Sequence, residues 1–153
     1  GSSQTIEAIL ETINELRNRS WGALVVIQRE TGLRSYKEAG MPLTAEVTAP
    51  LLISLFNPTS PLHDGAVIIQ NDIIEAAACI LPLTESTSIT PDMGTRHRAA
   101  LGLSEETDAI IIVISEETKK VSVAENGRFV NIEKDEMALR RYFNEQLFIS
   151  SGD

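Results

Sequence analysis

The sequence predicts an α/β fold: a single globular domain in which a mixed central β-sheet is flanked by helices. The chain has 153 residues, which suits one domain with a sizeable buried core. Apolar runs of strand length alternate with amphipathic segments of helical length. Two pairs of strand-like runs are joined by short polar turns, which is typical of antiparallel hairpins.

The first third of the chain predicts a helix, a buried strand and a second helix. Residues 5–19 carry one apolar stripe at helical spacing, made of Ile6, Ile9, Leu10, Ile13 and Leu16. Trp21-Gly22 ends this helix, and residues 23–27 form a continuous apolar run typical of a central strand. Residues 48–56 predict a short helix with Thr48 as its N-cap.

The rest of the chain predicts two hairpins and two more helices. Residues 66–70 and 73–81 flank the turn Asn71-Asp72, and a loop rich in Ser, Thr and Pro follows over residues 84–93. The later elements are a helix, a strand, a hairpin and a last helix, at residues 95–104, 109–115, 121–124 with 128–132, and 134–148.

Composition excludes several classes of protein. Hydrophobic residues make up 42% and charged residues 23%, which is the balance of a soluble globular protein. The net charge of −9 argues against a general nucleic-acid binder, which needs a basic face. No apolar stretch approaches the roughly 18 residues of a membrane span. The leading residues 1–3, Gly-Ser-Ser, are typical of a tag remnant, so the domain is expected over residues 4–150.

The run His63-Asp64-Gly65-Ala66 lies at a loop-to-strand junction, a common place for reacting groups. The Asp64 carboxylate can ligate a divalent metal or take a proton from a hydroxyl. Gly65 and Ala66 would let a bulky ligand approach the backbone. The alternative is a turn in which Asp64 caps its own backbone. A histidine-rich phosphohydrolase centre is excluded, because His97 is the only other histidine.

The run Gly94-Thr95-Arg96-His97-Arg98 places three basic residues where a helix begins. Cations in a first turn are disfavoured unless an anion binds there, and phosphate is the obvious candidate. Thr95 can cap the helix, and arginine adds forked bonds to phosphate oxygens. Because consecutive helical residues point about 100° apart, the three cannot all converge within a helix. Either the run begins in extended backbone, or one member faces the core or a partner. The alternative is a solvated basic patch.

Three further features bear on function. Ser115-Glu116-Glu117 ends an apolar strand, at a sheet edge where ligands often bind, although residue type alone favours a polar turn that opens the second hairpin. Cys79 is the single cysteine; it excludes an intramolecular disulfide, fits a reducing cytoplasmic setting and is expected to be buried and inert. One cysteine and two histidines are too few for a structural zinc cluster. There is no Walker-type phosphate loop.

Taken together, the His63–Ala66 and Gly94–Arg98 runs resemble the paired signatures of the diadenylate cyclase (DAC) domain. The resemblance covers about residues 20–125 and continues through Gly22–Ile27, Pro61-Leu62, Leu81-Pro82-Leu83 and Ile114–Thr118. The form Pro-Leu-His-Asp-Gly-Ala is similar to the membrane-anchored, CdaA-type branch. In that branch the cytoplasmic cyclase domain follows transmembrane helices, so a membrane is expected only through segments absent from this chain.

This resemblance implies the condensation of two ATP into cyclic di-AMP, with release of two pyrophosphates, between two facing protomers of a homodimer. It implies that Asp64 assists deprotonation of the 3′-hydroxyl and that His63 and Asp64 engage Mn²⁺ or Mg²⁺. The catalytic set it implies is Asp64, Arg96, His97 and Arg98. The nucleotide-binding set it implies is Gly65, Ala66, Leu81, Pro82, Leu83, Gly94, Thr95, Arg96, Arg98, Ser115 and Glu116.

Two other functions remain open from the sequence. The first is a non-catalytic sensor that binds an adenine nucleotide, which the intact Asp64 disfavours because a pure binder has little need for a reactive carboxylate. The second is a purely structural domain without nucleotide binding. Ile80 departs from the family pattern, since many relatives carry an aromatic residue at this position.

Overall fold

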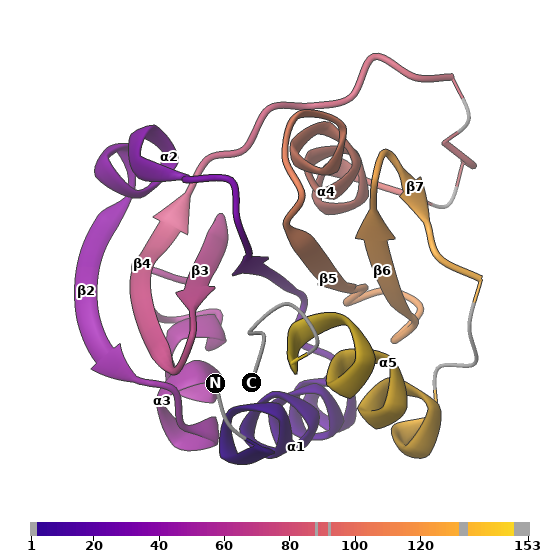
Figure 1. Ribbon diagram of the computed structural model, residues 1–153. Helices are drawn as coiled ribbons and strands as arrows, with labels where there is room; N and C mark the ends of the chain where they lie inside the picture. The colour runs from indigo at the N-terminus through magenta and orange to yellow at the C-terminus, as the bar shows by residue number, and fades with distance from the viewer. Residues whose placement is uncertain (1–2, 88, 92, 132–134, 149–153) are drawn as a thin grey trace.

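A mixed β-sheet runs through the middle of the molecule, with helices on both of its faces (Figure 1). The computed structural model describes residues 3–87, 89–91, 93–131 and 135–148. The helices are α1 (Ser3–Arg19), α2 (Arg34–Ala39), α3 (Ala49–Phe56), α4 (Thr95–Glu106) and α5 (Glu136–Phe148). The strands are β1 (Ala23–Gln28), β2 (Met41–Glu46), β3 (Ala66–Gln70), β4 (Ile73–Cys79), β5 (Ile110–Ile114), β6 (Val121–Glu125) and β7 (Arg128–Phe129).

The sheet has the strand order β2-β4-β3-β1-β5-β6-β7. β1 lies at its centre, parallel to β3 on one side and antiparallel to β5 on the other. The remaining pairs are antiparallel, including the predicted hairpins β3–β4 and β6–β7. The predicted fold class, a single α/β domain around a mixed sheet, is therefore confirmed.

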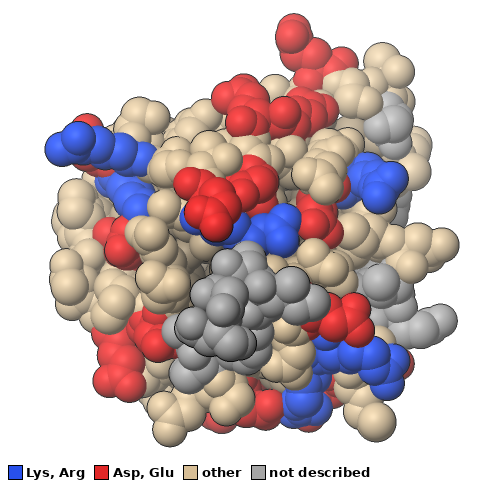
Figure 2. Space-filling model, in the orientation of Figure 1, with Lys and Arg blue, Asp and Glu red and all other residues tan. Residues whose placement is uncertain are grey.

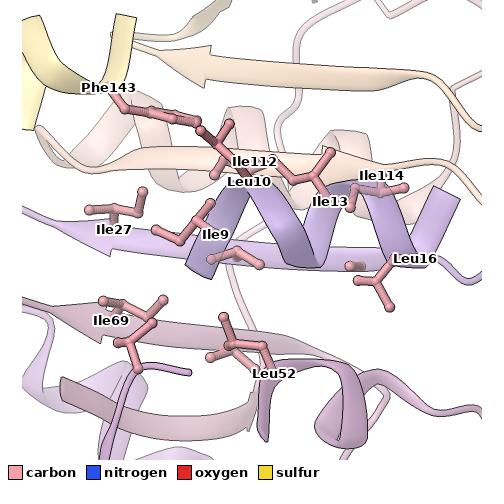
Figure 3. Close-up of a cluster of buried hydrophobic side chains, with 14 of the residues drawn as sticks. Ile9, Leu10, Ile13, Leu16, Ile27, Leu52, Ile69, Ile112, Ile114 and Phe143 are labelled. Atoms are coloured by element: carbon pink, nitrogen blue, oxygen red, sulfur yellow. The ribbon is translucent and has the colours of Figure 1, made fainter. Parts of the chain in front are cut away.

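The central strands β1, β3 and β5 are apolar except for the last residue of β1 and of β3, because both faces of the sheet are covered. Consecutive strand residues point to opposite faces. Val25 and Ile27 of β1 accordingly belong to the core beneath α1, α3 and α5, whereas Leu24 and Val26 belong to the core beneath α4. Figure 3 shows the first of these cores, with the α1 stripe lying along isoleucines of β1, β3 and β5.

Several predicted elements are confirmed near their expected bounds. α1 buries the predicted stripe, and β1 is buried along most of its length. Thr48 caps α3, since its side chain accepts a hydrogen bond from the Leu51 backbone N–H. The helix predicted at 134–148 begins at Glu136 among the described residues, while residue 134 lies outside them.

The structure also differs from the prediction in several elements. The helix α2 and the strand β2 were not predicted, because α2 buries no residue and β2 is a largely exposed edge strand containing Pro42. β4 ends at Cys79 rather than at residue 81. α4 continues past residue 104 to Glu106. β7 ends at Phe129, and residue 132, the predicted end of that strand, lies outside the described residues.

The surface and the helices bear on two expectations from the composition, that the protein has no basic face and no membrane span. Acidic and basic side chains are interspersed on the face in Figure 2, where the described residues form no continuous basic patch. Within the described part of the chain, none of the helices has the length and apolarity needed to cross a bilayer.

Candidate functional site

A cavity of about 590 Å³ lies at the end of the sheet where β1 and β3 begin and β4 and β5 end. Its volume is in the range of a site for one small-molecule ligand. Four segments form its walls: Asp64-Gly65, the stretch from Ala78 to Leu81 with Leu83, the first turn of α4 from Gly94 to His97, and Ser115-Glu116-Glu117. The two signature runs, which are separated in the sequence, therefore meet at one cavity.

The backbone around Gly65 is shaped by a close approach of β3 and β4. Gly65 has a φ of +104°, and its neighbour across the sheet, Ala78, has a φ of +55°. The register between the strands shifts between Ala66 and Ile68, as in a β-bulge. A Cβ at Gly65 would lie 2.8 Å from the Ala78 carbonyl carbon. Glycine is therefore required here, and the bulge turns Ala78 into the cavity wall beside Asp64.

His63 lies beside the cavity rather than in its lining. Its Nδ1 is 2.7 Å from the Ser60 carbonyl oxygen. Because a carbonyl oxygen only accepts, Nδ1 carries a proton, and Nε2 is the ring nitrogen left to ligate a metal. A ring held in this way by a backbone carbonyl is typical of histidines that ligate a metal.

α4 begins directly after a glycine. The N-cap is Gly94, in extended backbone, and it makes no side-chain cap hydrogen bond. The prediction that Thr95 caps the helix is therefore wrong: Thr95 is the first helical residue, and its side chain makes no cap bond. The N-terminus of a helix presents backbone N–H groups and a partial positive charge, which favour an anion.

The three basic residues diverge, as the helical geometry predicts. Arg96 lines the cavity, and its Nη1 donates a hydrogen bond to Glu116 Oε1 at 3.1 Å. His97 is buried and packs edge-to-face on Phe129, with ring centroids 5.8 Å apart, while also touching the cavity. Arg98 is exposed and lies outside the cavity lining. His97 is thus the member that faces the core.

The Leu81-Pro82-Leu83 wall is held against α4. Leu81 and Leu83 line the cavity, whereas Pro82 does not. A Cβ at Gly102 would lie only 1.8 Å from the Pro82 carbonyl oxygen, so the helix and the wall are in backbone contact. Just beyond the wall, the Thr84 backbone N–H donates to the Arg98 carbonyl at 3.0 Å. The predicted wall is therefore a rigid part of the site.

Some lining residues were not predicted. Leu24 and Val113 are cross-strand partners that form part of the lining, and they read as ordinary core residues in the sequence. Ile80 lines the cavity although the residue is 76% exposed, which is unusual for an isoleucine. Ala66, although predicted, is fully buried in β3 and outside the lining. An apolar residue that lies on the site by sheet position alone carries no local sequence signal.

Cys79 also lines the cavity, but as a protonated thiol. It is a free and buried cysteine, and burial raises its pKa from 9.0 to about 11. Because the thiolate is the nucleophilic form, this side chain is poorly reactive at neutral pH. The expectation of a buried, inert cysteine is confirmed as to burial.

Comparison with known proteins agrees with the site. A family model described as "DAC: DisA bacterial checkpoint controller nucleotide-binding" matches residues 10–129. The chain is 56% identical over 124 residues to the cyclic di-AMP synthase CdaA of Bacillus subtilis, covering 81% of this chain and 45% of that protein. It is 46% identical over 133 residues to a diadenylate cyclase of Listeria monocytogenes, covering 86% and 49% of the two proteins.

Solved structures show the same fold. A double cysteine mutant of DacA from Staphylococcus aureus superposes with a TM-score of 0.90 at 40% identity, covering 94% of this chain and 95% of that one. A membrane spanning protein of Bacillus cereus, described as hypothetical, gives a TM-score of 0.80 at 49% identity, covering 85% and 64%. The chain spans about half the length of the curated relatives CdaA and the Listeria cyclase. With its two signature runs joined at one cavity and the family model matching most of its length, the chain belongs to the DAC family of nucleotide-binding domains.

Proposed function

We propose that this chain is the catalytic domain of a diadenylate cyclase, which condenses two ATP into cyclic di-AMP and releases two pyrophosphates. The observation that carries the proposal is that Asp64, Arg96 and the N-terminus of α4 lie together in one cavity. The carboxylate can accept a proton, and the helix start with its arginine can hold phosphate. The names of the B. subtilis and L. monocytogenes relatives support the same reaction.

In the proposed reaction, Asp64 takes the proton of a ribose 3′-hydroxyl as the oxygen attacks the α-phosphorus of a second ATP. A new oxygen–phosphorus bond forms, the bond from that phosphorus to the bridging oxygen breaks, and pyrophosphate leaves with the bonding electrons. A second attack of the same kind, in which the two nucleotides exchange roles, closes the ring and releases the second pyrophosphate. Phosphoryl transfer of this kind depends on in-line positioning and on cations around the phosphates. Arg96 would supply a cation beside the phosphates, and the backbone N–H groups at the start of α4 would help to position them.

The donor set fits Mn²⁺ or Mg²⁺ shared with a triphosphate. Asp64 offers a carboxylate, and His63 Nε2 is the ring nitrogen left to ligate a metal by the bond of Nδ1 to Ser60. The described residues contain no group of three or more His, Cys, Asp or Glu that could hold a metal alone. Ions of this type commonly take one or two protein ligands and complete their shell with phosphates and water. When bound there, the ion would offset negative charge on the phosphates.

A homodimer is part of the proposal, because the reaction joins two nucleotides. The cavity of one chain has the volume of a site for one ligand. Two chains with their cavities facing would bring each 3′-hydroxyl to the opposite α-phosphorus.

We further propose that the full-length protein is anchored in the membrane by segments outside this chain. This is supported by the B. cereus neighbour, which is described as membrane spanning.

The test is turnover of ATP with Mn²⁺ or Mg²⁺, with cyclic di-AMP separated by chromatography. Asp64→Asn keeps the shape of the side chain but removes the base, so synthesis should fall at least about 100-fold. Glu11→Gln, an exposed carboxylate of α1, is the matched control and should leave synthesis unchanged. Near-normal synthesis by Asp64→Asn would contradict the role of Asp64. Tight binding of ATP by the wild type without product would favour a sensor instead.

A further inference from the structure

Gly22 is a buried glycine in the short connection between α1 and β1. Its backbone does not require glycine: among the described residues, the glycines with positive φ are Gly65 and Gly127. The end of α1 does not depend on Gly22 either, because the N–H of Trp21, immediately before it, already donates to the Leu16 carbonyl oxygen at this end of the helix. The reason for a glycine at this position must therefore be sought in the space around it.

That space is filled by the guanidinium group of Arg96. A Cβ built on Gly22 would lie 2.3 Å from Arg96 Nη1, 2.5 Å from Cζ and 2.9 Å from Nη2. Real Cβ atoms essentially never show contacts below 3.0 Å. The guanidinium thus lies directly on the backbone of Gly22, in the volume that any other side chain would occupy.

Glu116 makes the second contact that holds this guanidinium. Arg96 Nη1 donates to Glu116 Oε1 at 3.1 Å, and the Arg96 side chain is only 29% exposed. Gly22 and Glu116 therefore restrict a side chain that would otherwise sample many rotamers. An arginine restricted in advance loses less entropy when it binds an anion.

We propose that Gly22 is a positioning residue, whose missing side chain lets Arg96 keep its guanidinium in the cavity to meet a phosphate group. The inference rests on the proposed function for the identity of the anion, the triphosphate of ATP. Any side chain at position 22 displaces the guanidinium and removes a charge-assisted, forked contact with the phosphates.

Other glycines show why the effect should be specific. A Cβ at Gly65 or Gly102 would meet backbone atoms, which cannot rotate away. At Gly22 the three nearest atoms all belong to the far end of a flexible side chain. Alanine at position 22 is therefore accommodated by a rotation of Arg96, with the fold retained. Gly32 has no atom within 4 Å of its built Cβ and supplies a matched control.

The experiment is a double-mutant cycle read by calorimetric titration with ATP and Mg²⁺. Gly22→Ala should weaken ATP binding about 10-fold or more, the loss expected for a hydrogen bond to a charged group. Gly32→Ala should bind like the wild type. In an Arg96→Ala background, Gly22→Ala should change the Kd by less than about twofold, since the two sites then no longer couple. Wild-type binding by Gly22→Ala, or an equal loss in both backgrounds, would overturn the proposal.

A second measurement reads the geometry without any nucleotide. The Nε–Hε resonance of Arg96, assigned by its loss in Arg96→Lys, should shift in Gly22→Ala and stay in place in Gly32→Ala. An unchanged resonance in Gly22→Ala overturns the inference even if the domain makes cyclic di-AMP. If the wild type binds ATP without forming product, the proposed function fails, while the cycle still decides the role of Gly22. If the wild type binds no ATP at all, the shift of the Arg96 resonance alone decides the role of Gly22.

Discussion

Substitution of Gly65 by alanine tests how tightly β3 and β4 are joined beside Asp64. Two costs add at this position. Gly65 has a φ of +104°, and holding a non-glycine residue in such a region costs about 1–3 kcal/mol. Its new Cβ would lie 2.8 Å from the Ala78 carbonyl carbon and 2.9 Å from the Cys79 oxygen. Both are backbone atoms, so the strands must separate, which costs about 1–3 kcal/mol more.

We therefore expect Gly65→Ala to lower the free energy of unfolding by about 2–6 kcal/mol, or the melting temperature by roughly 5–20 °C for a chain of this length. Urea unfolding followed by circular dichroism measures it. Gly127→Ala separates the two costs, because Gly127 has a φ of +79° but its built Cβ meets only the Glu105 side chain, at 3.3 Å. It should lose only the conformational part, about 1–2 kcal/mol. Gly32→Ala should be neutral or slightly stabilising. A Gly65→Ala protein as stable as Gly32→Ala would refute the reasoning.

Two further predictions concern buried polar groups. Because burial raises the pKa of Cys79 from 9.0 to about 11, the folded state holds the thiol proton more tightly than the unfolded state, so stability should decline as pH rises between these values. Urea titrations at a series of pH values should show that the free energy of unfolding declines more steeply in the wild type than in Cys79→Ala. The same pH dependence in both proteins would contradict the prediction. Tyr142→Phe should cost about 1–2 kcal/mol, since the half-buried hydroxyl donates to Glu125 at 2.6 Å. Tyr36→Phe, which loses an exposed bond to Glu106, should cost less than about 0.5 kcal/mol by the same measurement, and equal losses would argue against burial as the cause.

The elements that were predicted well are those whose burial produces a periodic or continuous apolar pattern within the element itself. α1 carries one apolar stripe because one of its faces covers the sheet, and β1 is apolar from Ala23 to Ile27 because both of its faces are covered. α2 and β2 lack such a signal. The first buries no residue, and the second gains its stability from pairing with β4 at the sheet edge, a contact distant in the sequence. Propensity alone does not reveal a strand of that kind.

The candidate site divides in the same way. Residue types alone indicated a carboxylate at Asp64 and an anion-binding helix start at Gly94–Arg98, because their chemistry is local. Their meeting at one cavity depends on β1 lying between β3 and β5, which only the sheet order decides. The helical angle predicted that the basic residues diverge, but only packing on Phe129 selected His97 as the buried one.

The sequence by itself determined the fold class, the central strands and the chemical character of the site, since each follows from side chains within a short window. The tertiary structure alone decided the bulge at Ala78, the N-cap of α4 at Gly94 rather than Thr95 and the contact of Arg96 with Gly22. The physical reason is that these features are close approaches between segments far apart in the chain. Their cost or gain depends on which atoms occupy the same space, and no single segment carries that information.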